Sequence, residues 1–191
     1  NLDDKVRLHS VLSGCDCRGK IFWPKGYILP NEYDSFLADE RTSNNGKFIN
    51  EKKWVLKERS GYGSHGNSIA STNEVVSMYD AGKLVEAILC QRIVEPPMLM
   101  SSRKFTLRIY VIYFPGGTMR NGQEPKDSEV YISTEGLVKY ASAPYIGDAA
   151  NPFGADLDDQ YMTNSGRGDG RSAPQHDLHQ LQRAFQKNGV D

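Results

Sequence analysis

The sequence WVLKERSGYGSHGNSIAS, at residues 54–71, is the most informative stretch of the chain. Three apolar residues lead into Lys57, a pattern that indicates a short buried strand. A loop with three glycines follows, and residues 68–71 are typical of a returning strand. Glycine lets backbone N–H groups approach an anion, and lysine adds a positive charge, so the stretch predicts a hairpin that covers a phosphate. An ordinary structural turn has the same pattern, so the assignment depends on the rest of the chain.

Two common phosphate motifs are excluded by what surrounds these glycines. A P-loop needs Gly-Lys-Ser/Thr at the start of a helix, which the stretch lacks. The Gly-x-Gly-x-x-Gly spacing of residues 61–66 leads toward another strand, whereas a dinucleotide-binding fingerprint leads directly into a helix. The remaining interpretation is a phosphate-covering hairpin between two strands.

Composition limits the partners and the compartment. The chain has 191 residues, with 23 Lys plus Arg against 24 Asp plus Glu and a net charge of -1. This balance argues against a basic field over the whole protein, so we expect no nucleic-acid partner. No apolar run approaches the roughly 20 residues that a membrane span needs, and we expect no membrane partner. The three cysteines are few and odd in number, which favours unpaired thiols in a reducing, cytoplasmic compartment.

Residues 104–114, KFTLRIYVIYF, are rich in aromatic and β-branched side chains and predict a strand. Alternation along a strand places every second side chain on the same face. Three polar residues aligned on one face of a core strand are typical of a site lined from the sheet, whereas a strand end that emerges into solvent is the alternative. We expect one face to carry Lys104, Thr106 and Arg108, and the other Phe105, Leu107 and Ile109.

The other elements indicate an α+β fold with strands joined mostly by hairpins. Ser71 and Glu74 have the spacing of a capping box that opens a helix. Helices are expected at residues 32–41, 75–81 and 175–187, and either a helix or a strand near residues 6–12. Strands are expected at residues 87–94, 129–133 and 137–141, the last two joined around Gly136.

Five blocks of sequence occur here in an order known from one family. They are LPNE at 29–32, WVLK at 54–57 with its glycine loop, QRI at 91–93 with PML at 97–99, KFTLRIYV at 104–111, and EGLVK at 135–139 with Pro144-Tyr145 and Thr163-Asn164. In this order, residues 27–164 resemble the tubulin–tyrosine ligase-like family of ATP-grasp amino-acid ligases. The resemblance implies an α+β, ATP-grasp-like fold of mostly antiparallel sheets with flanking helices, incomplete at its C-terminal and N-terminal ends. It also implies three parts: an N-terminal lead-in at 1–50, a nucleotide-binding core at 51–165, and a flexible segment with a terminal helix at 166–191.

The resemblance also implies roles for individual residues. Arg108 matches an arginine that holds the acidic end of the acceptor or of the amino acid, and Lys139 stands where the family usually has arginine. Thr106 stands where the family usually has aspartate, which removes a charge beside the nucleotide. These matches imply catalytic roles for Arg108 and Lys139, and an ATP site formed by Lys57, Gly61, Gly63, Ser64, Gly66, Gln91, Arg92, Ile93, Lys104, Thr106, Thr163 and Asn164.

The function that the resemblance implies is ATP-dependent addition of Tyr, Glu or Gly to a protein such as tubulin through an acyl phosphate. It implies ATP and Mg²⁺ as cofactors, with the magnesium ligands expected beyond Asp191. The expected partners are ATP, the amino acid and tubulin or another protein with an acidic tail. The expected location is cytoplasmic, at the cytoskeleton or cilium. Two alternatives stay open: a non-catalytic relative that binds nucleotide or tubulin, and an ATP-grasp ligase that acts on small molecules.

Overall fold

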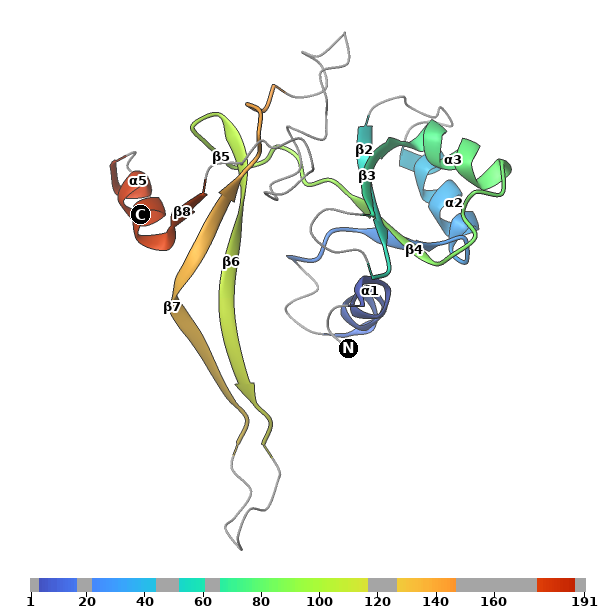
Figure 1. The fold of residues 1–191 in the computed structure, drawn as a ribbon. Coiled ribbons are helices and arrows are strands. Elements are labelled where there is room, and N and C mark those ends of the chain that lie inside the picture. Colours follow the sequence, from blue (N-terminus) through green and yellow to red (C-terminus); the bar gives the residue numbers. More distant parts are fainter. Residues whose placement is uncertain are drawn as a thin grey trace, which may run out of the picture. The chain divides into compact units, whose positions relative to one another are not determined.

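The computed structural model describes residues 4–16, 22–43, 52–60, 66–116, 127–146 and 175–187. These residues belong to two compact units: Asn1–Met98 with Ile146–Asp159, and Leu99–Tyr145 with Gln160–Asp191. All the strand pairs in the described residues are antiparallel, and helices flank the sheets, which confirms an α+β fold (Figure 1). The boundaries expected near residues 50 and 165 lie outside the described residues, so that three-part division stays a prediction.

The sheet of the first unit has the strand order β1-β4-β2-β3. The predicted phosphate hairpin supplies two of its strands, β2 (Lys52–Glu58) and β3 (Asn67–Ser71). The other two are β1 (Gly26–Leu29) and β4 (Ile88–Arg92), so the strand predicted at residues 87–94 is confirmed with shorter ends.

Two helices cover one face of this sheet, α2 (Tyr33–Ser43) and α3 (Thr72–Asp80). The predicted capping box is present at the start of α3, where Ser71 and Glu74 bond reciprocally. Trp54 is 1% exposed at the centre of the core. Its ring lies 5.3 Å from the ring of Phe36 and 5.9 Å from that of Tyr27, both edge-on, a favourable arrangement for aromatic pairs.

The opposite face of the sheet carries α1 (Lys5–Gly14), so the N-terminal segment is a helix rather than a strand (Figure 1). Asp4 caps it by accepting a hydrogen bond from the N–H of Arg7 at 2.9 Å. His9 is buried and its Nδ1 accepts a hydrogen bond from Trp23 Nε1 at 2.8 Å. The helix packs closely on β1, because a Cβ on Gly26 would lie only 3.0 Å from the His9 ring.

The second unit is built around a long hairpin of β6 (Arg103–Phe114) and β7 (Glu129–Tyr140). Short strands β5 (Leu99–Met100) and β8 (Gln175–Asp177) flank it, and α5 (Leu178–Lys187) packs on one face. The predicted strand at residues 104–114 is confirmed, but burial does not alternate along it, because Leu107 and Ile109 of the expected apolar face are exposed. Phe105 lies in the core, with its ring 6.3 Å from Tyr140 and 6.4 Å from Phe185 of α5.

Two expectations about this unit are wrong. The strands predicted at residues 129–133 and 137–141 form the single strand β7, without a turn at Gly136. Gly136 is buried opposite Ile109, where a Cβ would collide with the carbonyl oxygen of Arg108 and lie 2.9 Å from Leu178. The glycine therefore serves a close backbone approach, not a turn.

The terminal helix also begins later than expected. Residues 175–177 form β8, and α5 starts at Leu178. Asp177 explains the boundary, because its carboxylate accepts a hydrogen bond from the N–H of Gln180 at 2.6 Å, while the Gln180 side chain accepts one from the N–H of Asp177 at 3.0 Å.

The cysteines differ from the expectation of unpaired thiols. Cys15 is disulfide-bonded, whereas Cys90 is a buried free thiol in β4. Burial raises the pKa of the Cys90 thiol well above its usual range, so this residue behaves as a small apolar side chain. In the described part of the chain, no helix has both the length and the apolar character needed to cross a membrane.

Candidate functional site

The residues expected to bind ATP divide between the two units. Lys57, Gly66, Gln91, Arg92 and Ile93 belong to the first. Lys104, Thr106, Arg108 and Lys139 belong to the second. Gly61, Gly63, Ser64, Thr163 and Asn164 lie outside the described residues.

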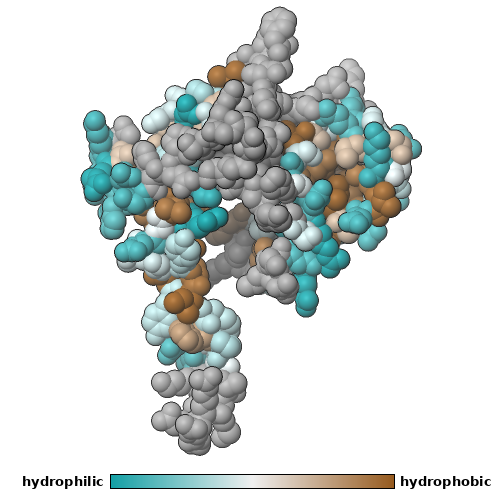
Figure 2. Space-filling view, viewed as in Figure 1, coloured by the Kyte–Doolittle hydropathy of each residue, from teal (hydrophilic) through white to brown (hydrophobic). Residues whose placement is uncertain are grey.

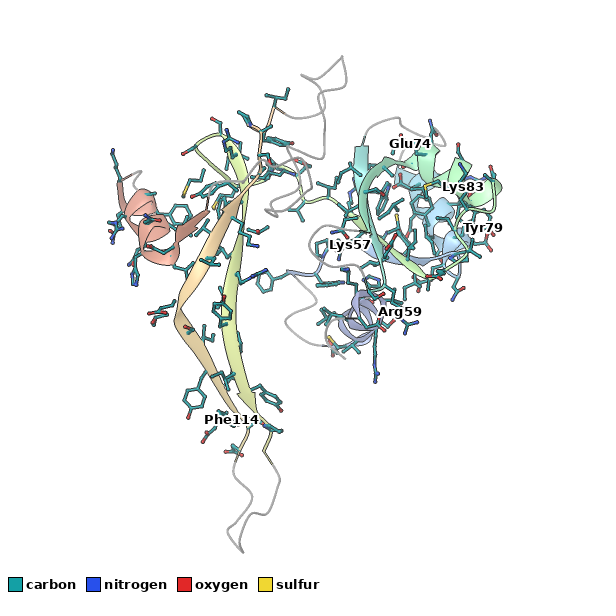
Figure 3. The ribbon with its side chains drawn as sticks, viewed as in Figure 1. Lys57, Arg59, Glu74, Tyr79, Lys83 and Phe114 are labelled. Carbon is teal, nitrogen blue, oxygen red and sulfur yellow. The ribbon has the colours of Figure 1, made fainter. Side chains whose placement is uncertain are left out.

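Lys57, which is labelled in Figure 3, meets Gln91 on the face of the first sheet that carries α1. Lys57 is in β2, on the opposite face from its neighbours Leu56 and Trp54 in the core. Its Nζ donates a hydrogen bond to Gln91 Oε1 at 2.7 Å. Gln91 is 4% exposed and is held in turn by a hydrogen bond from its Nε2 to the carbonyl oxygen of Pro24 at 3.2 Å. The structure therefore brings two of the expected ATP-binding side chains together.

The charge of Lys57 is held in an unusual setting. Burial lowers the pKa of the Lys57 ammonium, and the nearby charge of Lys5 lowers it further. In the described part of the chain its partner is the neutral amide of Gln91, not a carboxylate. A half-buried cation paired with a neutral dipole attracts an anion more strongly than a fully solvated cation does.

The turn between β2 and β3 needs a glycine at its end. Gly66 has a φ of +71°, a backbone conformation that side chains rarely adopt. Its carbonyl oxygen accepts a hydrogen bond from the N–H of Glu58 at 2.7 Å, which closes the hairpin one residue after Lys57. A Cβ on Gly66 would collide with the Glu58 side chain. The last glycine of the predicted phosphate loop is thus required by the backbone.

A cavity of about 260 Å³ lies at this hairpin end, lined by Lys57, Gly66 and Asn67 together with residues of the α3–β4 connection. Asn67 stands directly opposite Lys57 in the β2–β3 pairing. Its Oδ1 is buried and has no hydrogen-bond partner within the described residues. Buried polar atoms are nearly always paired, and this oxygen is an exception within the described residues.

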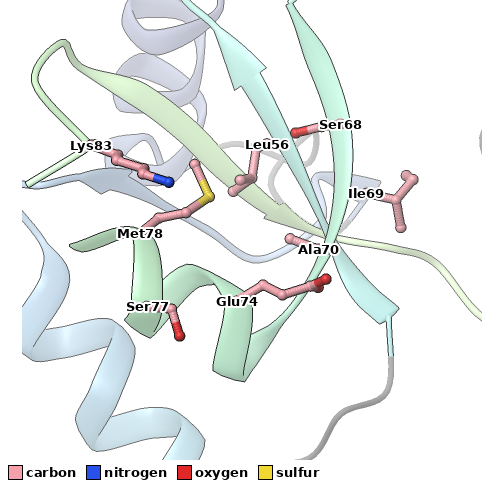
Figure 4. Close-up of a pocket in the computed structure, with 8 residues that line it drawn as sticks. All are labelled: Leu56, Ser68, Ile69, Ala70, Glu74, Ser77, Met78 and Lys83. Carbon is pink, nitrogen blue, oxygen red and sulfur yellow. The ribbon is translucent and has the colours of Figure 1, made fainter. Parts of the chain in front are cut away.

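A neighbouring cavity of about 300 Å³ lies between β3 and α3. In Figure 4, Lys83 and Met78 point toward Leu56 across this space. The two cavities share Leu56, Ser68, Met78 and Lys83. This second space is mainly apolar, and it lies on the helix-covered side of the sheet.

Arg92 and Ile93 follow Gln91 at the end of β4. The Arg92 side chain and the Ile93 N–H contact other residues than Lys57 and Gln91. Arg92 pairs with Trp54 across the strands, so its side chain lies on the opposite face from Gln91. Its guanidinium carbon lies 5.9 Å from the Trp54 ring centre, and Nη1 lies 4.0 Å from Glu40 Oε1. The N–H of Ile93 donates to the carbonyl oxygen of Lys53 at 2.8 Å.

In the second unit the expected polar stripe is present on the face of β6 opposite Phe105. Thr106 lies directly opposite Lys139, so these two side chains share a face with Lys104 and Arg108. α5 packs against the other face. Thr106 and Arg108 are exposed, and Lys104 is half-buried with its Nζ 4.8 Å from the ring centre of Tyr145. This stripe is a cationic surface that an anionic ligand can reach.

Sequence reasoning missed several residues that hold these groups. Asn67, Lys53 and Glu40 were not singled out, although Glu40 carried a signal. It lies four residues after Phe36 in an amphipathic helix, and this spacing predicts that its carboxylate lies on the apolar face. A carboxylate in that position needs a buried partner, and the structure supplies Lys53.

A magnesium site does not fit the described residues. No group of three or more His, Cys, Asp or Glu side chains able to hold a metal occurs among them. We therefore derive no chemical step from Mg²⁺.

Comparison with known proteins identifies a family and several relatives. The sequence model of the tubulin-tyrosine ligase family matches residues 2–166. The chain is 26% identical over 129 residues to tubulin polyglutamylase TTLL13 of Mus musculus, an alignment that covers 68% of this chain and 13% of the relative. It is 24% identical over 152 residues to probable tubulin polyglutamylase ttll-9 of Caenorhabditis elegans, covering 77% of this chain and 33% of the relative. It is 28% identical over 124 residues to tubulin monoglutamylase TTLL4 of Mus musculus, an alignment that covers 65% of this chain and 9% of the relative. The chain thus spans a third or less of the length of these relatives.

Proposed function

The chain belongs to the tubulin-tyrosine ligase family, and on that basis we propose that it is the ATP-binding part of a ligase that adds an amino acid to a protein. Among Tyr, Glu and Gly, we favour glutamate, because the relatives described above are named as tubulin glutamylases. The proposed acceptor is tubulin or another protein with an acidic tail, and the proposed location is the cytoplasm, at the cytoskeleton or cilium.

The observation that carries this proposal is the pairing of Lys57 with Gln91 beside the Gly66 turn. A half-buried ammonium with a neutral partner, next to a backbone turn that favours glycine, suits the phosphates of ATP. The unpaired amide oxygen of Asn67 in the same cavity supports the presence of a ligand there.

The proposed reaction has two steps. A carboxylate oxygen of the acceptor attacks the γ-phosphorus of ATP, so that an acyl phosphate forms and ADP leaves. The amine of the amino acid then attacks the acyl carbon, an amide forms, phosphate leaves, and the amine gives up its proton. Both steps concentrate negative charge, so cationic side chains that are fixed before the substrates arrive contribute most to catalysis.

In the proposed reaction, this chain's residues bind and orient the substrates. Lys57 binds ATP phosphates, and Gln91 holds the lysine in place. Arg108 and Lys139 bind the acidic end of the acceptor or of the amino acid, while Lys104 and Thr106 contact the nucleotide. Lysine at position 139 supplies charge but not the paired N–H groups of arginine, which favours a loosely held acceptor at that point.

The test is transfer of labelled glutamate to purified tubulin in the presence of ATP. We expect label in tubulin with the wild-type protein and none when Lys57 is replaced by methionine. Labelled tyrosine or glycine, supplied separately, tests the choice of amino acid. Incorporation by the Lys57→Met variant at the wild-type rate contradicts the assignment of this site.

A second candidate is a relative that binds nucleotide without turnover, as Thr106 in place of the family's usual aspartate suggests. Loss of that charge weakens the polar contacts to a nucleotide. A Lys57-dependent rise in melting temperature with ATP, without transfer of any amino acid, favours this candidate, since a ligand that binds only the folded state raises stability. Transfer to a small molecule but not to tubulin favours a small-molecule ligase.

A further inference from the structure

A buried network lies behind the end of β4, on the face of the sheet opposite Lys57. Its centre is Glu40 of α2, which is 2% exposed. The Glu40 carboxylate pairs with Lys53 Nζ at 2.8 Å and accepts a hydrogen bond from Thr72 Oγ1 at 2.6 Å. Trp54 Nε1 donates to the same Thr72 oxygen at 3.1 Å, so the network joins α2, β2 and α3.

The network reaches the segment that follows Gln91 by two routes. The first runs through Lys53, whose side chain pairs with Glu40 while its carbonyl oxygen accepts the N–H of Ile93 at 2.8 Å. The second runs through Arg92, whose Nη1 lies 4.0 Å from Glu40 and whose guanidinium lies over Trp54. The Glu40 carboxylate thus contacts Lys53, which accepts the hydrogen bond from Ile93, and Arg92, which precedes Ile93.

Lys53 needs such an anchor because the strand pairing is irregular there. The register between β2 and β3 shifts between Lys52 and Trp54. A residue at such an irregularity is not held by the regular ladder of backbone hydrogen bonds. The buried ion pair with Glu40 supplies the restraint that the ladder does not.

We propose that Glu40 is a positioning residue for nucleotide binding: it fixes Lys53 and Arg92, and through them the backbone of Arg92 and Ile93 next to Gln91. This inference rests on the proposed function for its consequence, which is ATP affinity. Its structural part, control of the Ile93 amide, stands independently of any ligand.

The neighbouring residue of α2 offers a matched control. Asp39 pairs with Lys25 at 2.7 Å, and the carbonyl oxygen of Lys25 accepts the N–H of Arg92 at 2.8 Å. The connection is similar, but the Asp39–Lys25 pair is about half exposed. Exposed pairs are weak because water screens them, and asparagine keeps an oxygen that can accept from the Tyr27 hydroxyl, so removal of the Asp39 charge should matter little.

The experiment removes both charges of the buried pair with the double variant Glu40→Gln/Lys53→Met. Glutamine still accepts from Thr72, and a buried ion pair replaced as a unit often leaves stability unchanged. We expect a cooperative unfolding transition near that of the wild type. We also expect hydrogen exchange at the Ile93 amide to accelerate roughly tenfold, with the Kd for ATP raised by a similar factor, as a loss of about 1.4 kcal/mol gives. Asp39→Asn should leave both quantities near their wild-type values.

A purely structural role would give a different result. Exchange at the Ile93 amide and at a core amide such as that of Leu89 would then accelerate by the same factor, or neither would change, and either result overturns the proposal. If the double variant loses its cooperative transition, Glu40→Asp keeps the charge one methylene shorter and should still accelerate exchange at Ile93 selectively. If the wild-type protein binds no ATP, the proposed function fails, while the Ile93 exchange alone still decides whether Glu40 positions this segment.

Discussion

The sheet of the first unit and the β6–β7 hairpin of the second contain similar side chains in very different surroundings. In the first, Tyr27, Phe36 and Trp54 are enclosed by α2 and α3. In the second, the half of the hairpin distant from α5 exposes many apolar side chains, and brown residues lie among paler ones on the side of the hairpin that Figure 2 shows. The exposed group comprises Ile109, Tyr110, Val111, Ile112, Tyr113, Phe114, Val130, Tyr131 and Ile132. Composition and alternation therefore predict a strand and its faces, but not which face is covered, because the cover comes from other parts of the chain.

The cations of the two units differ in the same way. Lys57 is half-buried, has a lowered pKa and donates a hydrogen bond to Gln91. Arg108 is exposed on β6. A half-buried cation held by a hydrogen bond suits one anion of defined geometry, whereas an exposed cation suits an extended acidic segment. The difference supports the proposed division of labour between these two cations, in which Lys57 binds phosphates and Arg108 binds the acidic end of the acceptor or of the amino acid.

The largest expected effect tests the packing difference. Trp54→Ala should lower the free energy of unfolding by about 3–5 kcal/mol, because it leaves a cavity among packed rings. Phe114→Ala removes a side chain that is 53% exposed and should change the free energy by no more than about 0.5 kcal/mol. Urea unfolding followed by circular dichroism measures both. Equal losses would show that the hairpin is covered in solution and would break the comparison.

The next effect tests the division of labour. Lys57→Ala should raise the KM for ATP about a hundredfold, since one charged donor to the bound phosphates is lost. Arg108→Ala should leave the KM for ATP near the wild-type value and should lower kcat/KM for the acceptor or the amino acid. Steady-state kinetics with each substrate varied in turn separates the two outcomes. If both variants impair ATP use equally, the units do not divide the substrates in this way.

A smaller effect concerns the turn between β5 and β6. Ser101 and Ser102 connect β5 to β6 with φ values of 50° and 58°, a conformation that favours glycine. Ser102→Gly should therefore raise the free energy of unfolding by about 0.5–1 kcal/mol. Ser10→Gly, inside α1, is the matched control and should lower stability by a similar amount. Thermal unfolding of both variants gives the sign, and a loss of stability in Ser102→Gly would contradict the turn geometry.

The smallest effect is a pH dependence specific to the first unit. Folding lowers the pKa of Lys57 below 10.5, so between the lowered value and 10.5 the unfolded chain binds more protons than the folded one. The contribution of Lys57 to the free energy of unfolding therefore rises with pH across this window. The difference in unfolding free energy between wild type and Lys57→Met should grow in favour of the wild type as pH increases. A flat difference would mean that folding does not lower the pKa of Lys57.

This difference measurement removes an opposing contribution. Burial raises the pKa of Tyr27, Tyr33 and Cys90, which are ionised more readily in the unfolded chain at high pH. Their contribution therefore falls with pH, but it is the same in the wild type and in the variant. It cancels in the difference.

Local features were readable from the sequence wherever a short-range interaction determines them. The capping box of Ser71 and Glu74, the strand of residues 104–114 and its two faces depend on neighbours a few residues apart. The α+β class follows from such elements. The wrong turn at Gly136 shows the limit, because the reason for that glycine is the carbonyl of Arg108, a contact between distant segments.

The candidate site was predictable to the same degree. Lys57 and Gly66 could be identified from the strand and loop pattern, and Gln91 only through the family resemblance. The contact between Lys57 and Gln91, the orientation of Arg92 away from them and the buried Glu40–Lys53 pair all depend on strand register, which no local pattern determines.

Gly136 also has a consequence for how this chain tolerates change. It lies in mid-strand, where a β-branched residue would ordinarily be preferred, yet the Arg108 carbonyl and Leu178 leave no room for a first side-chain carbon. A library randomised at this codon and selected for soluble protein should return glycine almost alone. The same library at the codon for Glu135, which is exposed, should return many different residues. A designer who replaces Gly136 by a residue with higher strand propensity would therefore destabilise the strand.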